Sequence, residues 1–195
     1  SFLKKFENCL IDIGAQNCHE SDEYGPHTGF INSKMLKNIG ANYVIIGHSE
    51  NRKNGENDKL INLKIKSAIK AKLKVIFCIG ETLSEKNKGK TKLILSKQIK
   101  LGLKKIKIKS NIFIAYEPVW SIGTGKIPKI RELDQIIKFI KGKFKDKLPK
   151  ILYGGSVNTQ NINDLKQISN LDGFLIGGAS QNSKKFIDIV KKTYS

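Results

Sequence analysis

The sequence contains few residues that hold metals or form disulfides. Three cysteines and three histidines occur among 195 residues. The odd number of cysteines, with no pair at C-x-x-C spacing, argues against both a disulfide framework and a zinc site. The histidines are also too scattered to suggest metal ligands. We expect the cysteines to be reduced thiols in the core; they are Cys9, Cys18 and Cys78.

Long hydrophobic runs are absent as well. Hydrophobic residues make up 39% of the chain, but no run approaches the roughly 18 apolar residues that span a bilayer. The start, Ser1-Phe2-Leu3-Lys4-Lys5, lacks the apolar stretch of a signal peptide. The length suits a single domain, since many domains have roughly 100–200 residues. We therefore expect a cytoplasmic protein with one domain over residues 1–195.

Acidic residues and arginine are scarce. Against 36 Lys+Arg there are 17 Asp+Glu, which leaves a net charge of +19. Such a charge attracts nucleic acid, anionic membranes or small phosphates. However, only Arg52 and Arg131 are arginine, the residue that best reads phosphates and base edges. We expect the lysines to lie on solvated helix faces, so a nucleic-acid binder, with its steep salt dependence, is the less favoured alternative.

Apolar, strand-like runs alternate with helix-like segments along the whole chain. Apolar residues recur at helical spacing in 131–148 and 183–192, and 86–105 is a lysine-rich helix or helix pair. Strands separated by helices are typical of parallel strands joined by helical crossovers, so the pattern predicts an α/β fold. The strand-like runs are Leu10–Gly14, Tyr43–Gly47, Val75–Gly80, Ile112–Glu117, Ile151–Gly155 and Phe174–Gly178.

The most informative segment is 115–125, Ala-Tyr-Glu-Pro-Val-Trp-Ser-Ile-Gly-Thr-Gly. Glu117 closes a buried strand, and a rigid Pro-Val-Trp stem with a Gly-Thr-Gly tip follows directly. This layout predicts an acid at the carboxyl end of a strand and a loop that swings over a small ligand and excludes water. The alternative is a surface turn that happens to carry a glutamate.

Two further strand ends carry glycine pairs. Gly154-Gly155-Ser156 and Gly177-Gly178 can offer backbone N–H groups and helix N-termini to an anion. They could instead serve only to make tight turns. Because the carboxyl ends of parallel strands lie on one face, we expect these segments, His48 and Glu117 to line a single pocket that binds phosphate.

Together these motifs resemble the triosephosphate isomerase family, in order and at similar spacing over essentially the whole chain. The resemblance implies a (βα) barrel, here incomplete, with about six parallel strands and flanking helices. The matching segments are Gly14–Asn17, Tyr43–Glu50, Cys78–Glu81, Ala115–Gly125, Tyr153–Asn158 and Gly173–Ser180.

The resemblance implies a reaction and roles for individual residues. It predicts interconversion of dihydroxyacetone phosphate and glyceraldehyde 3-phosphate in glycolysis and gluconeogenesis, without cofactor or metal. Glu117 would be the base that moves the proton. His48 would polarise the carbonyl as a neutral imidazole, as in that family, and Ser49-Glu50-Asn51 can begin the helix that follows it.

Other positions match the family's substrate-binding residues. The backbone of Gly123, Ser156, Gly177 and Gly178 would hold the phosphate. Ile122 and Leu175 would line the pocket, and the Glu50 carboxylate would support it from behind. Cys78 and Glu81 match structural positions.

The match begins at the family's third strand, so we expect its first two βα units to be absent, with Phe2–Asn8 resembling the end of the second helix. The family's Gly-Asn-Trp-Lys-x-Asn segment would be missing with them. Loss of its lysine would cost on the order of 10²–10³ in rate, by analogy with a lost oxyanion donor. The alternative function is therefore a catalytically impaired barrel fragment that retains a phosphate-binding end.

The third loop also departs from the family. Gly25–Phe30 replaces Gly-Ala-Phe-Thr-Gly-Glu, and Asn51 stands where arginine is usual. In the family this loop reaches into the partner subunit. Open strand edges pair readily with other chains, so we expect a homo-oligomer, or closure of a smaller barrel.

Overall fold

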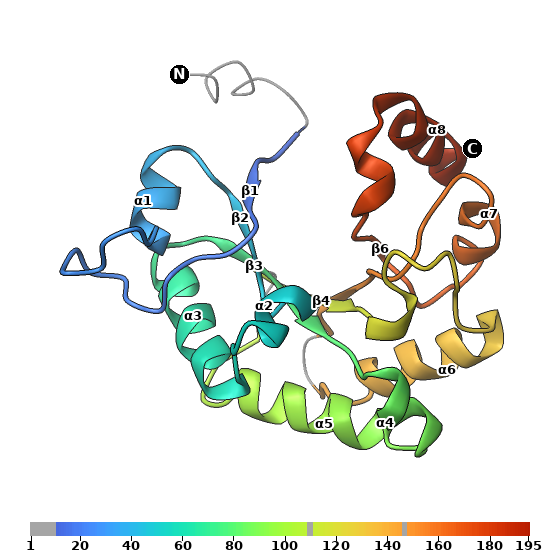
Figure 1. The fold of residues 1–195 in the computed structure, drawn as a ribbon, viewed down its shortest axis with the longest axis horizontal. Coiled ribbons are helices and arrows are strands. Elements are labelled where there is room, and N and C mark those ends of the chain that lie inside the picture. The colour runs from blue at the N-terminus through green and yellow to red at the C-terminus, as the bar shows by residue number, and fades with distance from the viewer. Residues whose placement is uncertain (1–10, 109–110, 146–147) are drawn as a thin grey trace. The chain divides into compact units, whose positions relative to one another are not determined.

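The computed structural model describes residues 11–108, 111–145 and 148–195 (Figure 1). Two compact units are present. The first comprises the described parts of Ser1–Cys78 and Gln98–Phe113, and the second comprises Ile79–Lys97 and the described part of Ile114–Ser195. The single domain expected from the sequence stays a prediction.

Six strands form a sheet in the order β1-β2-β3-β4-β5-β6, and the strand pairs β1–β2, β2–β3 and β5–β6 are parallel. In the first unit Val44 is aligned with Val75, and in the second Tyr153 is aligned with Phe174. The predicted α/β class is confirmed. The strands are β1 Gly14–Ala15, β2 Tyr43–Ile46, β3 Lys74–Ile79, β4 Ile112–Tyr116, β5 Lys150–Tyr153 and β6 Gly173–Phe174.

The first unit contains helices α1 (Ser33–Asn38), α2 (Ser49–Lys53) and α3 (Asp58–Lys70), as well as the end of α5 (Thr91–Gly102). The Asn57 side chain caps α3 by accepting from the backbone N–H groups of Lys59 and Leu60. Helix α3 lies against β2 (Figure 1) and buries the stripe Ile61, Ile65 and Ala68.

The second unit contains helices α4 (Leu83–Asn87), α6 (Ile130–Lys141), α7 (Ile162–Leu165) and α8 (Ser183–Tyr194). Two 3-10 turns, η2 (Val119–Ser121) and η3 (Gly178–Gln181), follow strands β4 and β6. The apolar stripe predicted for α6 is confirmed, because Leu133, Ile136, Ile137 and Ile140 are all buried.

Some element boundaries differ from those predicted. Of the two alternatives for 86–105, the helix pair is confirmed: α4 begins earlier, at Leu83, and ends before Gly89, whose φ is +67°, and α5 follows. The helix predicted over 131–148 ends at Lys141, since Gly142 caps it and Phe144 lies beyond. The last strand is shorter than Phe174–Gly178 and ends at Phe174.

The N-terminal predictions are tested only in part. Strand β1 covers Gly14–Ala15, while Leu10 lies outside the described residues. The same holds for Phe2–Asn8 and Cys9. The other two cysteines, Cys18 and Cys78, are buried as expected, and burial raises the pKa of Cys18 to about 12.

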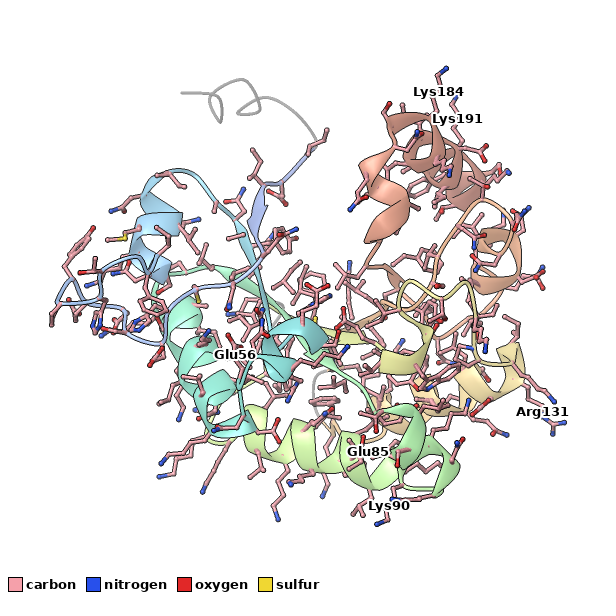
Figure 2. The ribbon with its side chains drawn as sticks, viewed as in Figure 1. Glu56, Glu85, Lys90, Arg131, Lys184 and Lys191 are labelled. Atoms are coloured by element: carbon pink, nitrogen blue, oxygen red, sulfur yellow. The ribbon has the colours of Figure 1, made fainter. Side chains whose placement is uncertain are left out.

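Basic side chains point outward from the second unit. Lys90, Arg131, Lys184 and Lys191 are exposed and project away from the ribbon (Figure 2). This agrees with a dispersed basic surface. Within the described ranges, no helix combines the length and apolar character needed to cross a membrane.

We predict that Gly102→Ala destabilises the first unit. A Cβ at Gly102 would lie 2.4 Å from Cζ of the fully buried Phe77, so the ring would have to move. Overpacking of this kind costs about 1–3 kcal/mol, more than the gain of up to ~1 kcal/mol from replacing a helical glycine. Urea denaturation monitored by circular dichroism measures the difference.

Gly142→Ala is the matched control. Gly142 has a helical φ of −63°, and a Cβ there would have its nearest contact at 3.4 Å. This substitution should leave stability unchanged or raise it by up to about 1 kcal/mol. Equal effects of the two substitutions would contradict the packing argument.

Candidate active site

Glu117 lies directly after β4 and is almost completely buried, with 2% of its surface exposed. Its backbone N–H donates to the Ile79 carbonyl at 2.8 Å. Two glycines make room for it. A Cβ at Gly80 would lie 1.8 Å from the Glu117 carbonyl oxygen, and one at Gly154 would lie 2.7 Å from Glu117 Cγ. The ends of β3, β4 and β5 therefore pack closely around Glu117.

A loop follows this acid, as predicted. Gly123 and Gly125 have φ values of +68° and +74°, a conformation that side chains rarely adopt. The Gly125 N–H donates to Ser156 Oγ at 3.0 Å, and Ser156 Oγ donates to the Ser121 carbonyl at 2.7 Å. The loop is thus attached to the residues that follow β5.

The stem of the loop is attached through Trp120. Its indole N–H donates to Glu81 Oε1 at 3.0 Å, and the Tyr116 hydroxyl donates to both Glu81 carboxylate oxygens at 3.2 Å. The Lys86 ammonium lies 3.9 Å from the centre of the Trp120 ring and 3.0 Å from the Glu132 carboxylate. Strand β4, the loop stem, α4 and α6 are therefore joined at one point.

Glu81 itself is fully buried. Burial raises its pKa, although the hydrogen bonds from Trp120 and Tyr116 and the charge of Lys86 act in the opposite direction. Burial and the neighbouring carboxyl also raise the pKa of Tyr116 well above its usual value, so this hydroxyl stays protonated and can donate.

The glycine pair that follows β6 is exposed, in contrast to the buried Glu117. Leu175 continues the pairing beyond the strand, since its N–H donates to the Tyr153 carbonyl at 2.9 Å. Gly177 precedes η3, and its carbonyl accepts from the Ser180 N–H at 2.9 Å and the Ser180 hydroxyl at 2.6 Å. Gly177 and Gly178 are exposed, so their backbone is accessible to a ligand.

His48 belongs to the first unit and is the residue before α2. Its Nδ1 accepts from the backbone N–H of Glu50 at 3.4 Å, which requires the lone pair on that nitrogen. The Glu50 carboxylate lies 3.9 Å from the same nitrogen. The predicted helix after His48 is confirmed as α2.

Arg52 fixes α2 in place. Its guanidinium donates to the carbonyls of Gly47 at 2.8 Å and Cys78 at 3.1 Å, and it pairs with Asp58 at 2.7 Å. The end of β2, the end of β3 and the start of α3 are joined by this one side chain. The backbone N–H of Arg52 also donates to the His48 carbonyl at 3.0 Å.

The second unit brings several predicted residues together. Glu117 packs against Gly154, and the loop from Ile122 to Gly125 is bonded to Ser156. Leu175, Gly177 and Gly178 follow the adjacent strand β6 in the same unit. His48 and Glu50 lie in the first unit, so the prediction that all of these residues line a single pocket stays a prediction.

The residues that hold the loop are not evident from the sequence. Ser121 and Tyr153 are buried and hydrogen-bonded to each other at 3.0 Å, and Lys86 contacts Trp120. Ser121 and Tyr153 both stand in recognised motifs, but nothing in their spacing indicates that they are partners.

Comparison with known proteins identifies the family. The family model for triosephosphate isomerase matches residues 1–193. The chain belongs to the triosephosphate isomerase family. It is 42% identical to the triosephosphate isomerase of Chloroherpeton thalassium over 195 residues, with 95% of this chain and 77% of the relative covered. The corresponding enzyme of Thermodesulfovibrio yellowstonii is 46% identical over 191 residues, with 94% and 77% covered.

A solved structure supports the same assignment. The crystal structure of triosephosphate isomerase from Bartonella henselae matches with a TM-score of 0.91 and 36% identity, covering 99% of this chain and 81% of that one. The predicted barrel type and the predicted isomerase class are therefore confirmed. The chain spans about three quarters of the length of the curated relatives named above.

We predict that Glu81→Gln changes how stability depends on pH. Because the folded state raises the pKa of Glu81, this residue stabilises the fold at acid pH, and that contribution is lost as the pH rises through the folded pKa. Glutamine keeps a hydrogen-bond acceptor for Trp120 but does not titrate. The variant should therefore gain stability relative to the unmutated chain as the pH rises above about 4, the usual pKa of a glutamate.

Urea denaturation of both proteins across this pH range measures the difference. A stability difference that is constant with pH, or one that falls as the pH rises, would contradict the account of Glu81.

Proposed function

We propose that the chain interconverts dihydroxyacetone phosphate and glyceraldehyde 3-phosphate by proton transfer through an enediolate, in glycolysis and gluconeogenesis. The observation that carries this proposal is the buried Glu117 carboxylate, which lies directly before a loop bonded to the residues after β5. A base that is shielded from water can move a proton between adjacent carbons without losing it to solvent. No cofactor or metal takes part in the proposed reaction.

Glu117 acts as the base in this proposal. It removes a proton from the carbon next to the carbonyl, the electron pair forms the enediolate double bond, and the proton is returned to the neighbouring carbon. The fit around Gly80 and Gly154 supports this role because it limits the positions that the carboxylate can take. A fixed base reduces the reorganisation needed in the transition state.

His48 is proposed as the electrophile. Its Nε2 is proposed to donate to the oxygen on which charge develops, because its Nδ1 accepts from the backbone at the start of α2. Glu50 begins the same helix and is proposed to support the site from behind, since its N–H holds the histidine ring.

The phosphate is proposed to bind the backbone N–H groups of Gly123, Ser156, Gly177 and Gly178. The exposure of the three glycines supports this, as does the attachment of the loop to Ser156. Ile122 and Leu175 are half-buried and would cover the apolar part of the substrate. The net charge of +19 would draw an anionic substrate toward the protein.

Glu117→Gln is the direct test of the base. An amide of the same size removes basicity, so turnover in a coupled isomerase assay should fall by about 10²–10⁴. The affinity for inorganic phosphate should change by less than about threefold, because the backbone holds the anion. Glu20→Gln, the same change on a half-exposed side chain in the first unit, is the control and should keep full activity.

Other outcomes favour other functions. If the unmutated chain binds inorganic phosphate but shows no turnover, the alternative of an impaired barrel with a phosphate-binding end is preferred. Binding to nucleic acid with a steep salt dependence would favour the lysine-rich binder instead. Equal turnover of the unmutated chain and Glu117→Gln would refute the role of Glu117. The cytoplasmic location stays a prediction.

We also propose that the chain forms a homo-oligomer. Tyr24, Phe30 and Ile31 on one loop of the first unit are 63%, 61% and 53% exposed, an unusual group of large apolar side chains in water. Sedimentation velocity at micromolar concentration should show an oligomer, and Phe30→Lys should shift it toward the monomer. A monomeric unmutated chain would refute the proposal.

A further inference from the structure

We propose that Ser121 is a positioning residue that holds the loop over residues 118–126 closed during turnover. This inference rests on the proposed isomerase function, because it assigns a task to a residue of the same site. Ser121 ends η2 at the start of the loop and its surface is completely buried. None of the roles derived from the sequence involves it.

The Ser121 hydroxyl connects the two ends of the loop. Its Oγ donates to the carbonyl of Lys126, which is five residues further along the chain and at the other end of the loop. The Ser121 carbonyl accepts from Thr124 Oγ at 3.1 Å and from Ser156 Oγ at 2.7 Å. Ser121 is thus the residue at which the start, tip and end of the loop meet.

The same hydroxyl also connects the loop to the end of β5. Ser121 Oγ lies 3.0 Å from the Tyr153 hydroxyl, and it accepts from the backbone N–H of Ser156 at 3.2 Å. Tyr153 is the last residue of β5, and Ser156 is three residues beyond it. One oxygen therefore joins a movable segment to a strand of the sheet.

The hydrogen-bonding capacity of serine fixes the direction of each bond. A hydroxyl has one proton and two lone pairs. The Lys126 carbonyl can only accept and the Ser156 N–H can only donate, so the proton of Ser121 goes to Lys126 and Tyr153 must donate. Burial raises the pKa of Tyr153 to about 12, which keeps that phenol protonated. All three sites on the Ser121 oxygen are then in use.

The surroundings leave no room for a larger group. A Cβ at Gly155 would lie 2.6 Å from Ser121 Oγ and 2.2 Å from the Tyr153 hydroxyl. Gly155 therefore serves to admit these two hydroxyls, in addition to making the turn after β5. The lack of a side chain at Gly155 is a second observation, which indicates that the contact between the two hydroxyls is specific and not accidental.

Ser121 is linked to the proposed phosphate site by its contact with Ser156. Its N–H is one of the proposed phosphate donors, and in the structure this N–H donates to Ser121 Oγ. A bound phosphate would take this N–H from Ser121 Oγ or share it, while the bond from Ser156 Oγ to the Ser121 carbonyl would still hold the segment against the loop. Ser121 therefore links occupancy of the phosphate site to closure of the loop.

Ser121→Ala tests this proposal. Loss of the hydroxyl leaves buried groups without this partner, so the closed loop is weakened. We expect kcat to fall by about tenfold or more, because the enediolate is less protected, while KM changes by less than about threefold. Tyr153→Phe, which removes only the phenolic donor, should lower kcat in the same direction.

Loop closure can be observed independently of turnover. Trp120 is the only tryptophan in the chain and lies in the stem of the loop. Addition of inorganic phosphate should change its fluorescence in the unmutated chain, and the change should be smaller in Ser121→Ala. This measurement tests the loop even if the isomerase assay gives no turnover, so a failure of the proposed function can be told apart from a failure of this inference.

Ser33→Ala is the matched control. Ser33 is also completely buried and its hydroxyl lies 2.7 Å from that of Ser67, but it belongs to α1 of the first unit. Ser33→Ala should lower the melting temperature about as much as Ser121→Ala does. Its kcat and its phosphate-induced fluorescence change should equal those of the unmutated chain.

A merely structural role for Ser121 would lower the melting temperature and leave kcat and the phosphate-induced fluorescence unchanged. That result in Ser121→Ala overturns the proposal. If Ser121→Ala does not fold, the same readouts in Tyr153→Phe decide between the two roles.

Discussion

The close approach of three strand ends around Glu117 is the constraint on which the rest of the second unit depends. Burying a carboxylate is costly, and the cost is accepted where the site needs a shielded base. The Glu117 backbone is held by Ile79 and fits because Gly80 has no Cβ, and its side chain fits because Gly154 has none. The glycines of the Gly80-Glu81 and Gly154-Gly155 motifs are therefore explained by packing around Glu117 as well as by the chemistry proposed for the site.

The arrangement of strands could be predicted from the sequence, because buried parallel strands appear as short apolar runs. Periodicity also predicted the buried stripe of α6. Helix ends were less predictable: Gly142 and Gly89 end helices within lysine-rich segments whose composition does not change there. At Gly89 the left-handed backbone conformation, rather than a change in hydrophobicity, determines the boundary.

The candidate site was predictable to a different extent. Family resemblance predicts that residues such as Glu117 and Ser156 meet the substrate, because those positions lie in contiguous motifs. The contacts that hold the loop join residues far apart in the chain: Trp120 meets Glu81 across 39 positions, and Ser121 meets Ser156 across 35. Pairings of this kind depend on tertiary packing, so a sequence pattern does not contain them.

The strength of these contacts explains how one loop can both close and open. Five neutral hydrogen bonds join Ser121, Lys126, Tyr153, Ser156 and Gly125. Each is worth about 1 kcal/mol net, whereas ordering each loop residue costs about 1–2 kcal/mol, and the loop over 118–126 has more residues than these bonds. The bonds alone therefore do not offset the entropy that is lost when the whole loop is ordered. In the proposed function a bound phosphate supplies part of the difference, so closure follows substrate binding and reverses when the product leaves.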